Sequence, residues 1–154
     1  MALNIVLVEP EIPQNTGNIA RTCALTETAL HLVRPLGFSI EDKYLKRAGL
    51  DYWSLVEIHY YDNFFEVLKK YPDNNFYYGT TKTKKSYVEP KYKDGDFLVF
   101  GKETRGLSQE ILDLNPDNRI RIPMKPIGRS LNLSNSVNII LFEALRQLNF
   151  PNLD

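Results

Sequence analysis

The chain has 154 residues, of which 43% are hydrophobic and 25% are charged, and its 19 basic and 19 acidic residues give a net charge of zero. This composition is typical of a globular protein, and no window has the ~18 apolar residues of a membrane-spanning helix. Zero net charge argues against strong nonspecific binding to nucleic acid, and the single cysteine, Cys23, excludes disulfides and cysteine-based zinc sites within one chain.

The first half of the chain alternates apolar runs with helical patterns. Leu3–Val8 is rich in β-branched residues, which predicts a buried strand. The segment lacks the basic start and the cleavage site of a signal peptide, so we interpret it as a strand. With a single cysteine, we expect a cytoplasmic protein. A helix follows, capped by Asn15 or Thr16, with apolar positions continuing to Leu30. We then expect strands over His31–Arg34 and Val56–Tyr61, a charged helix over Glu41–Ala48, and a helix over Phe64–Lys70 that Asp62 caps.

The second half continues the alternation. Strands are predicted over Phe76–Gly79 and Phe97–Gly101, separated by the polar, lysine-rich segment 80–96. A helix over Ser108–Leu112, a strand over Arg119–Ile122 and a helix over Ser134–Leu148 follow. Strands that alternate with helices predict an α/β fold with a mostly parallel sheet and helices on both faces. We expect a single domain over residues 1–154.

Three polar, glycine-containing loops follow predicted strands, where open α/β sheets bind their ligands. They span residues 9–17, 101–107 and 120–138. Gly101 and Gly106 have the spacing of a phosphate-binding P-loop, but the Lys-Ser/Thr pair that must follow is absent. These glycines either form a tight turn or let the backbone approach a ligand closely.

The third loop leads into the last helix through residues that are unusually polar for an apolar region. Polar groups near a core need partners, and those partners are the backbone, a second subunit or a ligand. The residues are Ser130, Asn132, Ser134, Asn135, Ser136, Asn138 and, later in the helix, Gln147.

The remaining candidate groups have ordinary structural explanations. His31 and His59 stand in no metal-ligand spacing, so we expect structural roles for both and no metal site. Basic residues form three clusters that are either solvated side chains or, if the fold joins them, one patch. The clusters are Lys82, Lys84, Lys85, Lys91 and Lys93; Lys43, Lys46 and Arg47; and Arg119, Arg121, Lys125 and Arg129.

Three segments together resemble the motifs of the SPOUT methyltransferases, in the branch named after SpoU and TrmH. They are Asn15–Arg21, Leu98–Leu107, and Ile122–Met124 continued by Arg129–Val137, in the order and spacing of that family. The short chain and its opening Glu9–Pro13 resemble a subgroup of small enzymes that methylate the ribose 2′-oxygen of the wobble cytidine or uridine in leucine tRNAs.

The resemblance implies more than the residue patterns do. It implies a C-terminal trefoil knot, S-adenosylmethionine as cofactor, and a homodimer with the first and last helices in the interface. It makes Arg21, Ser134 and Asn135 the catalytic residues, with Arg21 supplied by the other subunit. The residues that it assigns to cofactor binding are Gly79, Thr80, Gly101, Glu103, Ile122, Met124, Ser130 and Leu131.

Arginine is effectively always protonated, so Arg21 is a poor general base. We expect it to orient the ribose and a phosphate of a tRNA substrate and to stabilise developing negative charge on the attacking oxygen. The alternatives are the same chemistry on another RNA such as rRNA, a non-catalytic dimer that binds S-adenosylmethionine or RNA, and an α/β enzyme for a small molecule.

Overall fold

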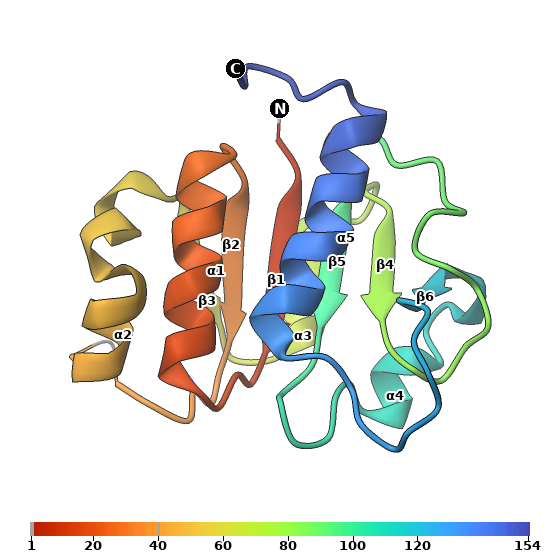
Figure 1. Cartoon of the computed structure of the whole chain (residues 1–154), viewed down its shortest axis with the longest axis horizontal. Helices are drawn as coiled ribbons and strands as arrows, with labels where there is room; N and C mark the ends of the chain where they lie inside the picture. Colours follow the sequence, from red (N-terminus) through yellow and green to blue (C-terminus); the bar gives the residue numbers. More distant parts are fainter. Residues whose placement is uncertain (1, 40) are drawn as a thin grey trace.

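The computed structural model describes residues 2–39 and 41–154, with the backbone alone for Lys46 and residues 48–51. Strands and helices alternate along these residues (Figure 1). The strands are β1 (Asn4–Val8), β2 (Ala29–Val33), β3 (Ile58–Tyr61), β4 (Phe76–Gly79), β5 (Phe97–Phe100) and β6 (Arg119–Ile120). The helices are α1 (Pro13–Leu25), α2 (Lys43–Gly49), α3 (Phe64–Lys70), α4 (Gln109–Leu112) and α5 (Leu133–Gln147), with short 3-10 helices η1 (Leu50–Leu55) and η2 (Pro116–Asn118).

The described strands form one six-stranded sheet in the order β3-β2-β1-β5-β4-β6. All of its strand pairs are parallel, and at its centre Ile5 of β1 lies between Leu30 of β2 and Leu98 of β5. Strands of a parallel sheet are buried on both faces and read as continuous apolar runs. The fully buried Phe-Leu-Val-Phe of β5 is such a run, and the predicted α/β class with a mostly parallel sheet is confirmed.

Helices cover both faces of the sheet (Figure 1). On one face, α1 and α5 pack over residues such as Ile5 and Leu98. On the other face, α3 and α4 pack over the alternate residues, such as Val6 and Val99. Successive side chains of a strand point to opposite faces, so each strand contributes to two apolar cores, as the prediction of helices on both faces requires.

The predicted start of the first helix was wrong. Helix α1 begins at Pro13, before both predicted caps, Asn15 and Thr16. Proline fits the first turn of a helix because its missing N–H would have no partner there. Ile12 occupies the cap position and its side chain makes no capping hydrogen bond. The helix also ends before Leu30, which lies in β2.

The predicted cap of α3 was wrong by one residue. Asn63, not Asp62, is the cap: its side chain accepts a hydrogen bond from the Glu66 amide at 3.1 Å, and the Glu66 carboxylate accepts one from the Asn63 amide. This reciprocal arrangement requires a spacing of three residues between the cap and the glutamate. The range of α3 itself, Phe64–Lys70, is the predicted one.

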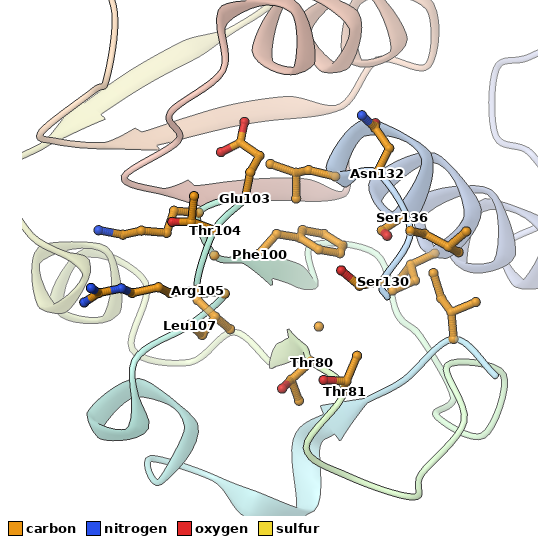
Figure 2. A pocket seen from close by; sticks show the side chains of 18 of the residues that line it. Thr80, Thr81, Phe100, Glu103, Thr104, Arg105, Leu107, Ser130, Asn132 and Ser136 are labelled. Carbon is orange, nitrogen blue, oxygen red and sulfur yellow. The ribbon is translucent and has the colours of Figure 1, made fainter. Parts of the chain in front are cut away.

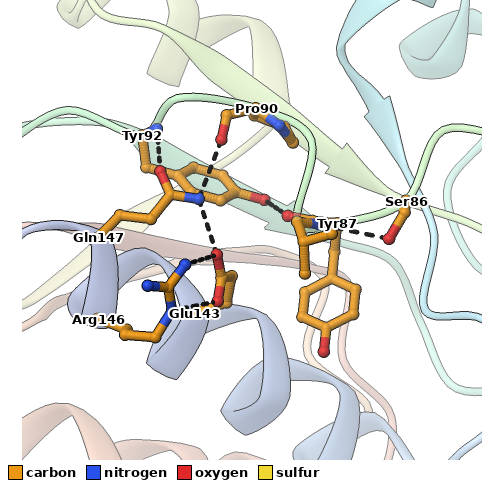
Figure 3. A network of polar contacts seen from close by, with 8 residues as sticks. Ser86, Tyr87, Pro90, Tyr92, Glu143, Arg146 and Gln147 are labelled. Atoms are coloured by element: carbon orange, nitrogen blue, oxygen red, sulfur yellow. Dashed lines mark hydrogen bonds and ion pairs between the residues drawn. The ribbon is translucent and has the colours of Figure 1, made fainter.

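The lysine-rich segment 80–96 is hydrogen-bonded to the C-terminal end of α5 (Figure 3). The Gln147 side chain accepts a hydrogen bond from the Tyr92 amide at 2.9 Å and donates one to the Pro90 carbonyl at 3.0 Å. Gln147 also donates to the Glu143 carboxylate at 2.8 Å. Of the three partners considered for this polar residue, the backbone is therefore the one it uses.

Two of the three predicted basic clusters adjoin. Segment 80–96 lies beside the cluster of residues 119–129, because the Arg121 guanidinium donates a hydrogen bond to the Thr81 carbonyl at 3.0 Å. The third cluster belongs to α2, which packs on α1 toward the opposite end of the sheet (Figure 1). The structure does not describe the side chain of Lys46, one residue of this cluster. The three clusters therefore do not form one patch within a single chain.

Candidate functional site

The loops that follow β4, β5 and β6 meet the start of α5 around a pocket of about 490 Å³ at the carboxyl ends of the strands. Pockets of this size bind small molecules and cofactors, and this is the edge at which open α/β sheets bind them. The structure brings all eight residues predicted to contact a cofactor into the lining of this one pocket: Gly79, Thr80, Gly101, Glu103, Ile122, Met124, Ser130 and Leu131.

Further polar groups line the pocket beyond those that the sequence assigned to the cofactor. Figure 2 shows Thr81 beside Thr80, across the pocket from Asn132 and Ser136. Within residues 2–39 and 41–154, the hydroxyls of Thr81, Ser130 and Ser136 make no hydrogen bond, so they are available to a ligand. Thr81 is the second residue after β4, and its place after a strand was the one signal that pointed to it.

The glycines of the loop after β5 are explained by the loop itself. A Cβ atom on Gly101 would lie 2.1 Å from the carbonyl carbon of Gly106, so the chain folds back where no side chain fits. Gly106 has a φ of +68°, a conformation that side chains disfavour. Of the two explanations that the sequence left open, the tight turn accounts for both residues, and this turn forms one wall of the pocket.

Glu103 binds the first helix through its carboxylate. Its two oxygens accept hydrogen bonds from the backbone amides of Glu11 and Ile12, both at 2.9 Å, and from the Asn15 side chain at 3.0 Å. A carboxylate here caps α1 and lies favourably at the positive end of the helix dipole. Figure 2 shows this side chain directed toward the first loop.

A second carboxylate, that of Glu11, connects the same two loops. Glu11 accepts hydrogen bonds from the hydroxyl of Thr104 at 2.8 Å and from its amide at 3.1 Å. The hydroxyl and then the amide of Thr104 lower the pKa of Glu11, as expected where hydrogen bonds favour the charged form. The Lys102 ammonium also lies 3.3 Å from a carboxylate oxygen of Glu9. The loop after β1 and the loop after β5 are therefore held together as one unit.

The predicted catalytic residues of the last helix lie at its start, next to the pocket but outside its lining. Asn132 caps α5, accepting hydrogen bonds from the Ser134 amide at 2.9 Å and the Ser134 hydroxyl at 2.7 Å. Ser134 is buried and Asn135 is exposed. The buried hydroxyl thus stabilises the helix start, while the Asn135 side chain remains accessible from solvent.

Arg21 lies away from the pocket of its own chain. It is exposed on α1 and does not contribute to the pocket lining, although Ile12 and Asn15 at the start of that helix do. Its guanidinium carbon lies 5.0 Å from the centroid of the Tyr52 ring. The structure therefore places eight predicted residues together and leaves the arginine apart from them.

His31 has the structural role that the sequence predicted. It is fully buried, and its two ring nitrogens lie 2.8 Å from the Tyr61 hydroxyl and 2.9 Å from the Asn4 side-chain oxygen. Burial lowers the pKa of His31 to about 3, with smaller contributions from His59 and Lys70. In the described part of the chain, no three His, Cys, Asp or Glu side chains are placed to share a metal ion, and no helix is long and apolar enough to cross a membrane.

The fold and the pocket define a parallel α/β protein with a site for a small molecule at the strand ends. A sequence profile of the SpoU rRNA Methylase family matches residues 2–142. The chain belongs to this family.

Relatives of similar length have more specific names than the family does. The chain is 48% identical over 150 residues to a tRNA (cytidine(34)-2'-O)-methyltransferase of Escherichia coli, covering 97% of this chain and 96% of the relative. It is 50% identical over 148 residues to the enzyme of the same name from Methylovorus glucosotrophus, covering 96% of each chain. A solved structure described as giving insight into the 2-OH methylation of C/U34 on tRNA superposes with a TM-score of 0.91 at 43% identity, covering 96% of this chain and 97% of the other.

Proposed function

We propose that this protein is an S-adenosylmethionine-dependent methyltransferase that methylates the ribose 2′-oxygen of the wobble cytidine or uridine in leucine tRNAs. The observation that carries the proposal is the convergence of eight residues from three loops on one pocket, in a chain with full-length relatives of that tRNA activity at about 50% identity. We propose that all 154 residues form one such domain in the cytoplasm, with the loop before α5 passing through a trefoil knot.

The residues of the pocket fit the cofactor. Ile122, Leu131 and Phe100 supply apolar surface for a base, and the free hydroxyls of Ser130, Ser136 and Thr81 supply hydrogen bonds for polar ends. The carboxylate of Glu103 is turned toward α1, so we assign it no hydrogen bond to the cofactor. S-adenosylmethionine supplies an electrophilic methyl group on a sulfonium when it is bound.

The position of Arg21 supports a dimeric site. Because this side chain lies outside the pocket of its own chain, a second subunit would have to bring Arg21 to the pocket. Leu25 of α1 and Phe142 of α5 are exposed apolar side chains, at 62% and 45%. An interface over α1 and α5 accounts for these exposed side chains and for the position of Arg21.

The chemistry follows from these positions. Methyl transfer is an in-line displacement that requires the 2′-oxygen to approach the methyl carbon from the side opposite the sulfur. Arg21 of the second subunit would bind the ribose oxygen and a neighbouring phosphate through its planar fork of N–H groups. It would act by orientation and by stabilising negative charge on the oxygen, and the exposed Asn135 would contact the ribose.

The deciding experiment is transfer of labelled methyl from S-adenosylmethionine to unmodified leucine tRNA, followed by mapping of the modified nucleotide. We expect label on the wobble ribose of leucine tRNA and none on rRNA. Label on rRNA alone, or cofactor binding in a calorimeter with no transfer to either RNA, would refute the proposal and favour the rRNA enzyme or the non-catalytic module.

The role of Arg21 has its own test. Arg21→Ala should lower kcat by about 10²-fold or more, the cost of removing one charge-stabilising donor. Arg21→Lys should recover only a small part of this loss, because an ammonium keeps the charge but not the fork. Near-wild-type turnover of Arg21→Lys would show that the fork is not needed, and full activity of Arg21→Ala would remove the residue from catalysis.

A further inference from the structure

The Arg21 side chain makes one defined contact in the described part of the chain. Its guanidinium carbon lies 5.0 Å from the centroid of the Tyr52 ring. It makes no hydrogen bond or ion pair with a described residue. Among the described residues, the Tyr52 ring is therefore the group that holds the guanidinium, and none of these residues accepts a hydrogen bond from its five N–H donors.

The Tyr52 ring belongs to a short helix that no pattern in the sequence predicted. Tyr52 lies in η1, which packs on α1. The next residue, Trp53, packs against the apolar core on the α1 side of the sheet. Successive residues of a 3-10 helix point about 120° apart, so Trp53 anchors η1 to the core while Tyr52, half-buried, reaches Arg21 on the outside of α1.

An exposed arginine without a neighbour samples many rotamers. Fixing such a side chain costs conformational entropy. An aromatic ring beside the guanidinium attracts the cation, and more strongly when the pair is desolvated. The ring therefore orders the Arg21 side chain in part before the RNA binds. The attraction is specific for a cation, in agreement with an electrostatic role for Arg21 and not with proton abstraction.

We propose that Tyr52 is a positioning residue for the methyl-transfer reaction: its ring face holds the Arg21 guanidinium in one plane, with the N–H edge free for a ribose and a phosphate of the RNA. The inference rests on the proposed function, since Arg21 must take part in the transfer. It assigns the effect to the aromatic ring and not to the Tyr52 hydroxyl.

The kinetic test compares Tyr52→Leu, which removes the ring, with Tyr52→Phe, which keeps it. Tyr52→Leu should lower kcat by about three- to thirtyfold, the fold-change that corresponds to a lost cation–π contact, with an unchanged KM for S-adenosylmethionine. Tyr52→Phe should remain within twofold of the wild type. Tyr60→Leu is the matched control, because Tyr60 makes the same contact with Arg34 at 5.0 Å, and it should leave kcat unchanged.

A spectroscopic measurement on the protein without RNA tests the contact independently of activity. The Arg21 side-chain N–H resonance should be shifted by the Tyr52 ring in the wild type and in Tyr52→Phe, and should move to the position of a free arginine in Tyr52→Leu. Unchanged backbone spectra outside α1 and η1 would show that the variant is folded.

The outcomes separate this inference from the proposed function. A wild-type protein that fails to methylate tRNA overturns the function, whatever the resonances show. An active wild type with Tyr52→Leu equal to Tyr60→Leu in kcat overturns the positioning role. An active wild type in which Tyr52→Phe is as slow as Tyr52→Leu overturns the assignment to the ring.

Discussion

At the scale of single residues, the acidic side chains of the loops after β1 and β5 bind the protein's own backbone. Glu103 accepts two amide hydrogen bonds at the start of α1, and Glu11 accepts two hydrogen bonds from Thr104. Both carboxylates connect the loop after β1 with the pocket loop after β5. Their contribution to the pocket is therefore to fix where its walls stand relative to α1, the helix that carries Arg21.

The Glu103 contacts predict a loss of stability in Glu103→Gln. The variant keeps the size of the side chain, but its amide nitrogen is a donor that would face a backbone N–H. We expect the free energy of unfolding to fall by about 1–2 kcal/mol, the usual effect of a lost helix cap or charged hydrogen bond. Urea unfolding measures it, and Glu110→Gln on the following helix is the control, with a change below about 0.5 kcal/mol. A Glu103→Gln protein as stable as the control would show that the charge is not needed.

The buried His31 predicts a pH dependence of stability. The Asn4 amide nitrogen faces backbone carbonyls, so its oxygen accepts from His31 Nε2, and the Tyr61 hydroxyl donates to Nδ1 of a neutral ring. The pKa is about 3 in the folded protein and about 6.5 in the unfolded chain. Between these values the unfolded chain binds the additional proton, so stability is fully present above pH 6.5 and falls as the pH drops toward 3.

We expect this single group to add a slope of about 1.4 kcal/mol per pH unit between pH 6 and 4. His31→Gln keeps a donor and an acceptor but does not titrate, so its unfolding free energy should change less steeply with pH than that of the wild type. His59→Gln, at the neighbouring histidine, should keep most of the wild-type slope. Parallel curves for the wild type and His31→Gln would show that this ring does not titrate on unfolding.

At the scale of elements, strands and the pocket edge could be predicted, whereas caps and contacts between helices could not. β4 and β5 are continuous apolar runs that a doubly covered sheet requires, and the polar loops after them mark the edge where the pocket lies. The cap of α3 depended on which of two adjacent residues, Asp62 or Asn63, met the glutamate three positions later. The contact of Tyr52 with Arg21 depends on how η1 packs on α1, which no local pattern encodes.

The hydrogen bonds between segment 80–96 and α5 predict that Gln147→Leu makes this segment more mobile. Leucine cannot pair with the Tyr92 amide or the Pro90 carbonyl, and each unpaired backbone group costs about 1–3 kcal/mol where water is excluded. We expect faster hydrogen exchange in residues 86–93 and weaker binding of tRNA, because the lysines of this segment lose their fixed positions. Arg146→Ala, which removes an ion pair with Glu143 but no hydrogen bond to segment 80–96, is the control and should leave exchange unchanged. Unaltered exchange in Gln147→Leu would show that other contacts hold the segment.

At the scale of the whole molecule, the face formed by α1 and α5 has features that the proposed dimer would explain. It carries the exposed apolar side chains of Leu25, Ile139 and Phe142 at 62%, 37% and 45%, and the Arg21 that its own pocket does not reach. Isolated exposed apolar residues are common on monomers. Their presence on the two helices that the family resemblance places in a dimer interface makes this face the expected contact, and symmetry would then give two composite sites per dimer.

Composite sites predict that two inactive variants restore activity when their subunits are mixed. Arg21→Ala keeps the pocket but lacks the arginine, and Ile122→Trp keeps the arginine but fills the pocket. In a mixed dimer, one site combines the intact pocket of the first variant with the intact Arg21 of the second. Random mixing in equal amounts makes half of the dimers mixed, each with one complete site of two, so roughly one quarter of wild-type activity should return.

The same mixture distinguishes the two places from which the arginine can act. If Arg21 served the pocket of its own chain, every site in the mixed dimer would lack either the arginine or an open pocket, and no activity would return. Unmixed samples of each variant, unfolded and refolded in parallel, control for recovery caused by refolding alone. Activity that rises with the fraction of mixed dimers, counted by native mass spectrometry, would place the arginine in the partner's site and make the dimer the functional unit.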